Sequence, residues 1–289
     1  MDLVFLQGSK SGPRQEEAAL TLTKIYGETM EIGLIGAGFI GACLARKLKD
    51  AGHTVRIANS RGPETLADLA KEVGATAVSV VDVAKQSDVL IISVPMKAIQ
   101  QFPANLFDGA RRDLIVVDTG NYYSMRDGRI EPLESGMPET MWVAEQLGRP
   151  VVKAFNNISF DSLRNQGRPK GSPERFALPV AGDNQRAKDV VIGLIEEIGF
   201  DGVDAGGLDA SWRQQPGSAA YCTNLGASRL KEVMQGLTAD YRAKLGERRD
   251  MALKKMLELP NGIDIGQGFK LPFAKDSVPL NRSLAGLPD

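Results

Sequence analysis

The stretch EIGLIGAGFIG, residues 31–41, joins a short apolar run to three glycines that open an amphipathic segment. In this setting Gly36 permits a tight turn, Gly38 lets a pyrophosphate approach the backbone, and Gly41 lets a helix pack against the strand. The free amides of the first helical turn then face the phosphates. With a second strand expected at residues 54–58, the pattern predicts a βαβ unit that binds a dinucleotide through Gly36, Ala37, Gly38, Phe39, Ile40 and Gly41.

The end of the second expected strand reads Asn59-Ser60-Arg61. NAD-binding units commonly carry an acidic residue there, whose carboxylate binds the ribose hydroxyls and would repel a 2′-phosphate. An amide, a hydroxyl and a guanidinium do not repel it, and Arg61 can bind it through charge-assisted hydrogen bonds. We therefore predict NADP(H) as the cofactor, with Asn59, Ser60 and Arg61 at its 2′-phosphate. The alternative for Arg61 is a solvated loop cation.

Composition excludes several classes of partner. The 289 residues include 35 Lys and Arg and 36 Asp and Glu, and no run of one sign stands out. Neither nucleic acid nor a membrane surface is therefore expected as a partner. The two cysteines are too few for a disulfide framework, which favours the cytoplasm and a buried, apolar role for Cys43. No apolar stretch reaches the length of a membrane span, and no metal site is expected.

Strand and helix patterns alternate along the chain. Further strands are expected at residues 75–78, 88–95, 114–118, 150–155, 176–181 and 202–204, with helices from Ser218 to about Leu259 and a Pro- and Gly-rich tail. This order predicts an α/β fold, a Rossmann-type doubly wound, mostly parallel sheet with a smaller C-terminal mixed or helical domain. The expected division is residues 1–29 as an N-terminal extension (an added leader, an overcalled start or a real arm), 30–150 as the NADP-binding domain, and 151–289 as the smaller domain.

Ligands of such sheets bind beyond the carboxyl ends of the strands. This rule predicts three more groups of cofactor-binding residues, around the nicotinamide: Ser93, Val94 and Pro95; Thr119, Gly120 and Asn121; and Ala154, Phe155 and Asn156. Val94 and Pro95 would form an apolar wall. Pro95 equally suits the start of a helix, and Asn156 and Asn157 equally suit a helix cap.

The sequence offers no evident acid–base pair for catalysis. The single histidine, His53, precedes the strand at residues 54–58, which would separate it from the cofactor by about 16 Å. It is expected to be a surface turn residue. Near the strand ends, the remaining candidates for a proton donor are Asp118, Tyr122, Tyr123 and Lys153, of which Tyr122 and Lys153 are retained as weak candidates. Residues 122 to about 137 form a loop long enough to act as a lid. Transfer of a hydride to a flavin-like ring needs little from such a residue, because the ring nitrogen exchanges its proton with water.

Residues 32–41, 59–62 and 153–158 resemble the NADP oxidoreductases that use coenzyme F420, a family that includes a domain similar to the cytosolic part of the STEAP metalloreductases. The resemblance runs from about Glu31 to Gly199 and continues weakly into Cys222. It implies that Ser60 and Arg61 hold the 2′-phosphate and that a deazaflavin or flavin stacks over the nicotinamide beside residues 151–155. Residues 118–123 and 211–216 depart from the compact F420 enzymes and resemble a bacterial subgroup, and the helical extension after Leu237 is longer.

The resemblance implies an NADPH-dependent oxidoreductase that moves a hydride between NADP(H) and a flavin-like or F420-type acceptor, with F420, FMN or FAD as that acceptor. By analogy it implies a homodimer. One alternative is a β-hydroxyacid or imine reductase of a small molecule, which would need Lys153 or Tyr122 as proton donor. Another is a non-catalytic sensor that binds NADPH. Trp212 and Arg213 either hold a ring acceptor and its anionic tail or are a core plug beside a solvated arginine.

Overall fold

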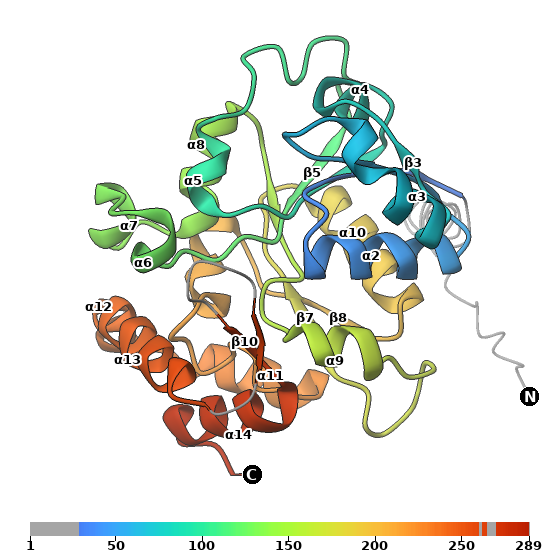
Figure 1. Ribbon diagram of the computed structural model, residues 1–289. Coiled ribbons are helices and arrows are strands. Elements are labelled where there is room, and N and C mark those ends of the chain that lie inside the picture. The colour runs from blue at the N-terminus through green and yellow to red at the C-terminus, as the bar shows by residue number, and fades with distance from the viewer. Residues whose placement is uncertain (1–28, 260–261, 265–269, 289) are drawn as a thin grey trace, which may run out of the picture.

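A six-stranded parallel sheet forms the centre of the computed structural model, which describes residues 29–259, 262–264 and 270–288 (Figure 1). Its strands are β1 (Glu31–Ile35), β2 (Thr54–Ala58), β3 (Thr76–Ala77), β4 (Val89–Ile92), β5 (Ile115–Asp118) and β6 (Val152–Lys153). They lie in the order β3-β2-β1-β4-β5-β6, and every neighbouring pair is parallel. This order confirms the predicted Rossmann-type fold, with its reversal point between β1 and β4. The expected N-terminal extension lies outside the described residues, except for Thr29.

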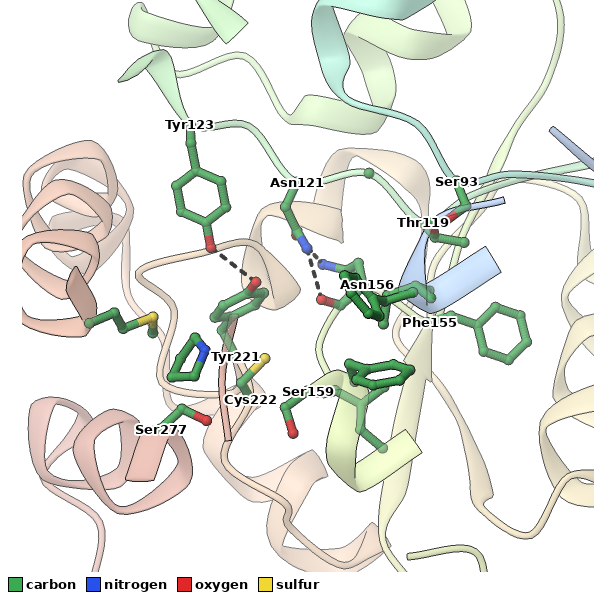
Figure 2. A pocket seen from close by; sticks show the side chains of 18 of the residues that line it. Ser93, Thr119, Asn121, Tyr123, Phe155, Asn156, Ser159, Tyr221, Cys222 and Ser277 are labelled. Carbon is green, nitrogen blue, oxygen red and sulfur yellow. Dashed lines mark hydrogen bonds between the residues drawn. The ribbon is translucent and has the colours of Figure 1, made fainter. Parts of the chain in front are cut away.

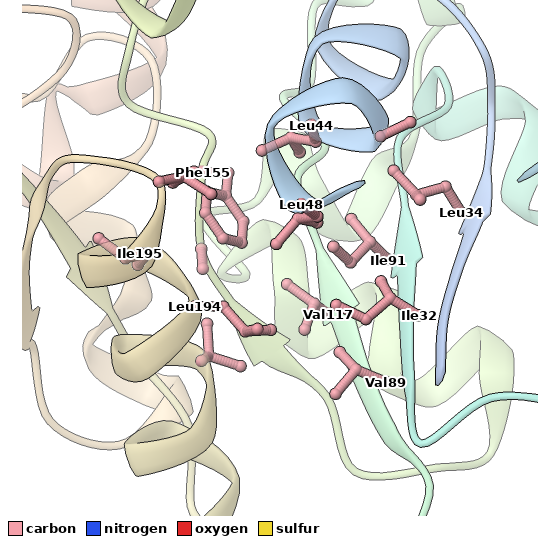
Figure 3. Packing of buried hydrophobic residues seen from close by; sticks show 14 of the residues in the cluster. Ile32, Leu34, Leu44, Leu48, Val89, Ile91, Val117, Phe155, Leu194 and Ile195 are labelled. Atoms are coloured by element: carbon pink, nitrogen blue, oxygen red, sulfur yellow. The ribbon is translucent and has the colours of Figure 1, made fainter. Parts of the chain in front are cut away.

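Both faces of the sheet are covered by helices, which explains why its strands read as nearly continuous apolar runs. Alternate residues of β1 point to opposite faces: Ile32 and Leu34 join one apolar cluster, and Ile35 joins another. The first cluster packs against α2 (Phe39–Asp50) and α10 (Gln185–Glu197), as Figure 3 shows for Leu44, Leu48, Leu194 and Ile195. The second cluster packs against α4 (Val80–Lys85), α5 (Met96–Ile99) and α8 (Glu139–Leu147).

Local signals in the sequence end and begin these helices. Gly62, at φ +98°, precedes Pro63, which opens a 3-10 turn (Pro63–Leu66) leading into α3 (Ala67–Val73). Gly74 follows α3 in the left-handed conformation that glycine adopts without strain. The Ser79 hydroxyl accepts a hydrogen bond from the Asp82 amide and so caps α4.

A second, two-stranded parallel sheet joins the first through β6. It consists of β7 (Ala177–Val180) and β8 (Asp201–Asp204), followed by a 3-10 helix (Leu208–Gln214), and α9 (Phe160–Asn165) precedes it. Lys153 and Ala181 exchange two backbone hydrogen bonds, with N···O distances of 2.8 and 3.0 Å. The large sheet thus continues past residue 150, and the division of the chain into two domains near that point remains a proposal.

The C-terminal segment is mainly helical, as predicted up to Leu259. It contains α11 (Ala227–Gln235), α12 (Ala239–Ala243), α13 (Leu245–Leu257), the strand pair β9 (Gly262–Asp264) and β10 (Lys270–Pro272), and α14 (Ala274–Ala285). Helix α14 was not predicted, because Pro279 stands inside it and interior proline costs about 3 kcal/mol. Tertiary bonds hold it, among them one from Arg282 Nε to the Thr223 carbonyl at 2.9 Å. The loop expected after Tyr122 also holds short helices, α6 (Ser124–Asp127) and α7 (Glu131–Glu134). None of the described helices is long and apolar enough to cross a bilayer.

Candidate active site

The glycine turn between β1 and α2 has two kinds of glycine. Gly36 adopts φ +103°, and a Cβ there would overlap the Ser93 carbonyl. A Cβ on Gly41 would overlap the Gly36 carbonyl, so this glycine lets α2 pack against the strand end. A Cβ on Gly38, by contrast, would meet nothing within 4 Å. The fold itself needs Gly36 and Gly41, whereas Gly38 leaves an open approach to the backbone of the kind a pyrophosphate needs.

A cavity of about 440 Å³ lies at the carboxyl ends of β1, β4, β5 and β6 (Figure 2). The strand-end rule predicted one side of it: the cavity is lined by Gly38, Phe39, Ile40, Ser93, Val94, Pro95, Thr119, Gly120, Asn121, Phe155 and Asn156. Pro95 lines the cavity and also precedes α5 as its N-cap residue. The helix-cap alternative for Asn156 and Asn157 is wrong, because Ser159 caps α9.

Most of the other side of the cavity was missed from the sequence, which offered only Tyr123 there, as a proton-donor candidate. It is lined by Tyr123, Arg126, Ile158, Ser159, Phe160, Tyr221, Cys222, Leu253, Met256, Leu257, Pro272, Ser277 and Asn281. Most of these belong to α13, α14 and the segment before α11, which fold back over the strand ends. No local pattern tells which face of a distant helix will cover a sheet edge. The apolar spacing of α13 was the available signal, and it did not indicate which part of the fold the apolar face would cover.

Several predicted cofactor-binding residues lie outside the cavity. Gly36, Ala37 and Gly41 belong to the turn behind it, and Asn59, Ser60 and Arg61 lie at the end of β2. The two places are adjacent, because the Gly36 amide donates to the Ala58 carbonyl at 2.9 Å. Ala154 is completely buried in the apolar core and contributes no surface.

The corner after β2 presents an exposed guanidinium. The Asn59 side chain accepts a hydrogen bond from the Arg61 amide at 2.9 Å and donates one to the Thr65 hydroxyl at 2.9 Å. Asn59 therefore shapes the loop, while the Arg61 side chain extends from it. Within the described ranges, no hydrogen bond or ion pair occupies the Arg61 guanidinium. The exposed Glu64 carboxylate lies against Gly62. The corner can thus receive an anion.

A hydrogen-bond network holds the strand-end side of the cavity. Asn121 and Asn156 exchange two hydrogen bonds, from Asn121 Nδ2 to the Asn156 carbonyl and from Asn156 Nδ2 to Asn121 Oδ1, each 3.0 Å long (Figure 2). Asn156 Nδ2 also donates to the Gln214 carbonyl at 2.7 Å. Phe155, between β6 and this network, has φ +61°, a left-handed conformation that costs a non-glycine residue about 1–2 kcal/mol. The network holds this backbone in place beside the cavity.

Lys153 lies beneath the cavity wall, not in the cavity. Its side chain is fully buried, and Nζ donates to Asp118 Oδ2 at 2.9 Å and to the Gly120 carbonyl. Asp118 Oδ1 in turn accepts the Gly120 amide at 2.7 Å. The ion pair therefore bonds both the carbonyl and the amide of Gly120, a residue that lines the cavity. Lys153 positions this loop and cannot reach a ligand as a proton donor.

A second carboxylate, that of Glu139, borders the same buried pair. Its Oε2 lies 3.8 Å from Lys153 Nζ and accepts no hydrogen bond. Burial raises the pKa of Glu139 to about 7, against the attraction of Lys153. The folded state therefore holds a proton on Glu139 that the unfolded chain releases at lower pH. Its ionisation destabilises the fold.

Glu139→Gln should flatten the pH dependence of stability. Because the folded-state pKa lies above the unfolded value, the wild type loses stability as pH rises from about 4.5 to somewhat above 7. The variant lacks the titrating group and should lose less across that window. Urea unfolding at pH 5 and pH 8 measures the difference; an equal loss for both proteins would contradict the protonated state assigned to Glu139.

Tyr122 also lies outside the cavity. Its side chain is 1% exposed, and its hydroxyl donates to Glu134 Oε1 at 2.6 Å and accepts the Ile130 amide at 3.1 Å. Burial raises its pKa to about 12. These bonds hold the segment between α6 and α7. Tyr122 thus has a structural role, and neither weak catalytic candidate faces the cavity.

The expectation of a surface position for His53 is wrong. The residue is 3% exposed, because Nδ1 accepts the Met30 amide at 3.2 Å and Nε2 bonds Glu197 Oε2 at 2.7 Å. Glu197 belongs to a helix far along the chain, so local sequence patterns could not predict this contact. His53 still lies at the amino end of β2, away from the cavity. Among the described residues, no group of three or more His, Cys, Asp or Glu is placed to hold a metal ion.

Trp212 and Arg213 lie outside the cavity as well. Trp212 is 4% exposed and packs with Ala219 and Leu237 in a small cluster, with the Arg213 guanidinium 4.8 Å from its ring. This arrangement matches the core plug beside an arginine. Cys43 is buried in α2, as expected.

Comparisons with known proteins agree with this geometry. Residues 31–122 match the family described as NADP oxidoreductase, coenzyme F420-dependent. The Escherichia coli (strain K12) protein YjhV is 35% identical over 137 residues, which cover 47% of this chain and 83% of that protein. The crystal structure of a hypothetical protein from Sinorhizobium meliloti is 31% identical, with a TM-score of 0.58, and covers 72% of this chain and 98% of that one.

A proposed F420-dependent NADP reductase from Arthrobacter sp. FB24 shares the fold. It is 22% identical, with a TM-score of 0.51, and the match covers 62% of this chain and 86% of that one. The match over residues 31–122 begins at β1 and includes the glycine turn, the corner after β2 and the Thr119–Asn121 loop. The chain therefore belongs to the NADP oxidoreductase, coenzyme F420-dependent family and is an NADP-dependent oxidoreductase.

Proposed function

We propose that this protein transfers a hydride from NADPH to a flavin-like or deazaflavin acceptor of the F420 type. One observation carries the proposal: a single cavity extends from the glycine turn, past the carboxyl ends of β4, β5 and β6, to the apolar wall of α13 and β10. The nicotinamide and the ring it reduces must touch, and this cavity offers both partners one space.

Residues along the carboxyl edge of the sheet support NADPH as the hydride donor. The exposed Arg61 guanidinium, with Ser60, would hold the 2′-phosphate, and the open backbone at Gly38 would receive the pyrophosphate. Val94, Pro95 and Gly120 would then border the nicotinamide. When bound there, NADPH supplies the hydride, and the protein supplies its orientation.

The acceptor side suits a flat ring. Its wall contains the apolar side chains of Leu253, Met256 and Pro272, and a volume of about 440 Å³ lies within the usual range of small-molecule sites. FMN, FAD and F420 each carry such a ring. Because the ring nitrogen exchanges its proton with water, the transfer needs no protein proton donor, in agreement with the positions of Tyr122 and Lys153 outside the cavity.

The decay of NADPH absorbance at 340 nm, followed with FMN, FAD and F420 in turn, tests the proposal. Steady consumption with at least one of the three, and none without acceptor, is the expected result. Tight NADPH binding without turnover on any ring or small carbonyl would contradict it and favour the non-catalytic sensor. By family analogy we also propose that the protein is cytoplasmic and forms a homodimer. Size-exclusion chromatography with light scattering would test the dimer.

A second candidate is reduction of a small carbonyl or imine compound, such as a β-hydroxyacid or imine reductase performs. The hydroxyls of Tyr123 and Tyr221 on the cavity wall favour it, because such a reaction needs a proton or hydrogen-bond donor near the acceptor.

In either case Tyr122→Phe should leave turnover within about twofold of the wild type, because the Tyr122 hydroxyl bonds Glu134 and does not face the cavity. It should lower the free energy of unfolding by roughly 1–3 kcal/mol, since the part-buried Ile130 amide loses its acceptor. Turnover with the active acceptor and urea unfolding are the two measurements. A tenfold or larger loss of kcat in a stably folded variant would show that Tyr122 takes part in the reaction.

A further inference from the structure

Two phenol side chains meet on the cavity wall and are not among the residues proposed to hold NADPH. Tyr123 precedes α6, at the end of the loop that follows β5, and Tyr221 lies in the segment before α11. Their hydroxyl oxygens are 3.0 Å apart (Figure 2). Tyr123 and Tyr221 are 98 positions apart in the sequence, and the fold brings them together as one polar pair on a mostly apolar wall.

The pair has one hydroxyl proton to spare. Two phenols carry two protons, and the bond between them uses one. In the part of the chain that the structure describes, neither hydroxyl has a second hydrogen bond of normal geometry, and the neighbouring Cys222 thiol is at most a weak acceptor for Tyr221. Burial raises the pKa of Tyr123 and Tyr221 above the usual value, so both are neutral donors at neutral pH.

The backbone fixes the pair toward the cavity. Cys222, next to Tyr221, has φ +52°. Its amide donates to the Asn157 carbonyl at 3.0 Å, and its carbonyl accepts Asn281 Nδ2 at 3.3 Å. Strained conformations of this kind persist where the surroundings hold them and cluster at ligand sites. On the other side, the Tyr123 amide donates to Asp127 Oδ2 at 3.2 Å.

We propose that Tyr123 and Tyr221 act as a hydrogen-bonded donor pair that binds a carbonyl oxygen of the hydride acceptor. The inference rests on the proposed function and adds to it the chemistry of the acceptor: a flat, neutral ring that bears a carbonyl group. The apolar side chains of Leu253, Met256 and Leu257 strengthen such a bond, because they exclude water from it. The pair orients the ring against the nicotinamide, and no proton transfer is required of it.

Binding of FMN to the protein saturated with NADP⁺ tests the pair, because this complex cannot react. Quenching of FMN fluorescence gives the dissociation constant. Tyr123→Phe and Tyr221→Phe should each weaken FMN binding about threefold to tenfold, the effect of one lost hydrogen bond. The double variant should lose little more than either single one, because the two hydroxyls act as a unit.

Tyr241→Phe is the matched control. Its hydroxyl is also hydrogen-bonded, to the Gly217 carbonyl at 2.9 Å, but it lies outside the cavity, so FMN binding should not change. NADP⁺ affinity should stay constant in all four variants, which shows that they fold. Unchanged FMN binding in both single variants, or no FMN binding by the wild type, would overturn the inference. FMN binding that depends on the tyrosines without any NADPH turnover would instead overturn the proposed reaction and leave the pair intact.

Discussion

Lys153→Met is expected to lower the free energy of unfolding by about 3–5 kcal/mol, the usual cost of removing one partner from a buried ion pair. Lys153 and Asp118 are 0% and 1% exposed in their side chains, and Glu139 lies beside them. The variant leaves the buried Asp118 carboxylate without a cation, beside the protonated Glu139. It also frees the Gly120 carbonyl on the cavity side, so NADPH affinity should fall together with stability. Urea unfolding and an NADPH titration measure both effects.

Lys188→Met provides a matched control for this prediction. The Lys188 side chain is also buried, at 7% exposure, but its partner Asp204 is 42% exposed and remains solvated when the lysine is lost. The control should therefore lose clearly less stability than Lys153→Met. Equal losses of stability for the two variants would show that burial of the lysine stem causes the loss and that the Lys153–Asp118 ion pair under Gly120 does not.

Arg61→Ala is expected to weaken NADPH binding by about 1.5–3 kcal/mol, the range for a hydrogen bond to a charged group, or about 10- to 150-fold in the dissociation constant. NADH carries no 2′-phosphate, so its affinity should stay nearly constant. The corner after β2 supports this expectation, because Arg61 is exposed there and the Asn59 side chain holds the loop that presents it.

The control for Arg61 is Arg229→Ala on α11, which removes a half-exposed arginine at 46% exposure from a helix away from the corner. It should change neither affinity. If Arg61→Ala weakens NADPH and NADH equally, the guanidinium supports the loop and does not read the phosphate, and the preference for NADP(H) loses its basis.

The first half of the fold could be predicted because its signals are local. Gly36 and Gly41 are required by close backbone contacts within ten residues or with the adjacent strand, and the apolar runs of β1, β4 and β5 reflect burial on both faces. Since parallel strands end at a common edge, their sequence order then placed Ser93, Thr119 and Asn156 beside one cavity.

The rest depends on contacts between distant segments. Helix α14 contains Pro279 and reads as a loop, yet its contacts with residues 222–224 hold it against the cavity. His53 reads as a turn residue and is buried because Glu197 comes to it from α10. Tyr221 has no pattern of its own, and only the folded chain brings it to Tyr123. Packing of this kind leaves no periodic mark in the sequence.

Titration calorimetry of the wild-type protein with NADPH and with NADH tests the central claim most directly, because every step depends on a phosphorylated dinucleotide at the carboxyl edge of the sheet. We expect a 1:1 binding heat with NADPH and an affinity for NADH that is at least about tenfold weaker. No heat with either NADPH or NADP⁺, or equal affinities for NADPH and NADH, would contradict it.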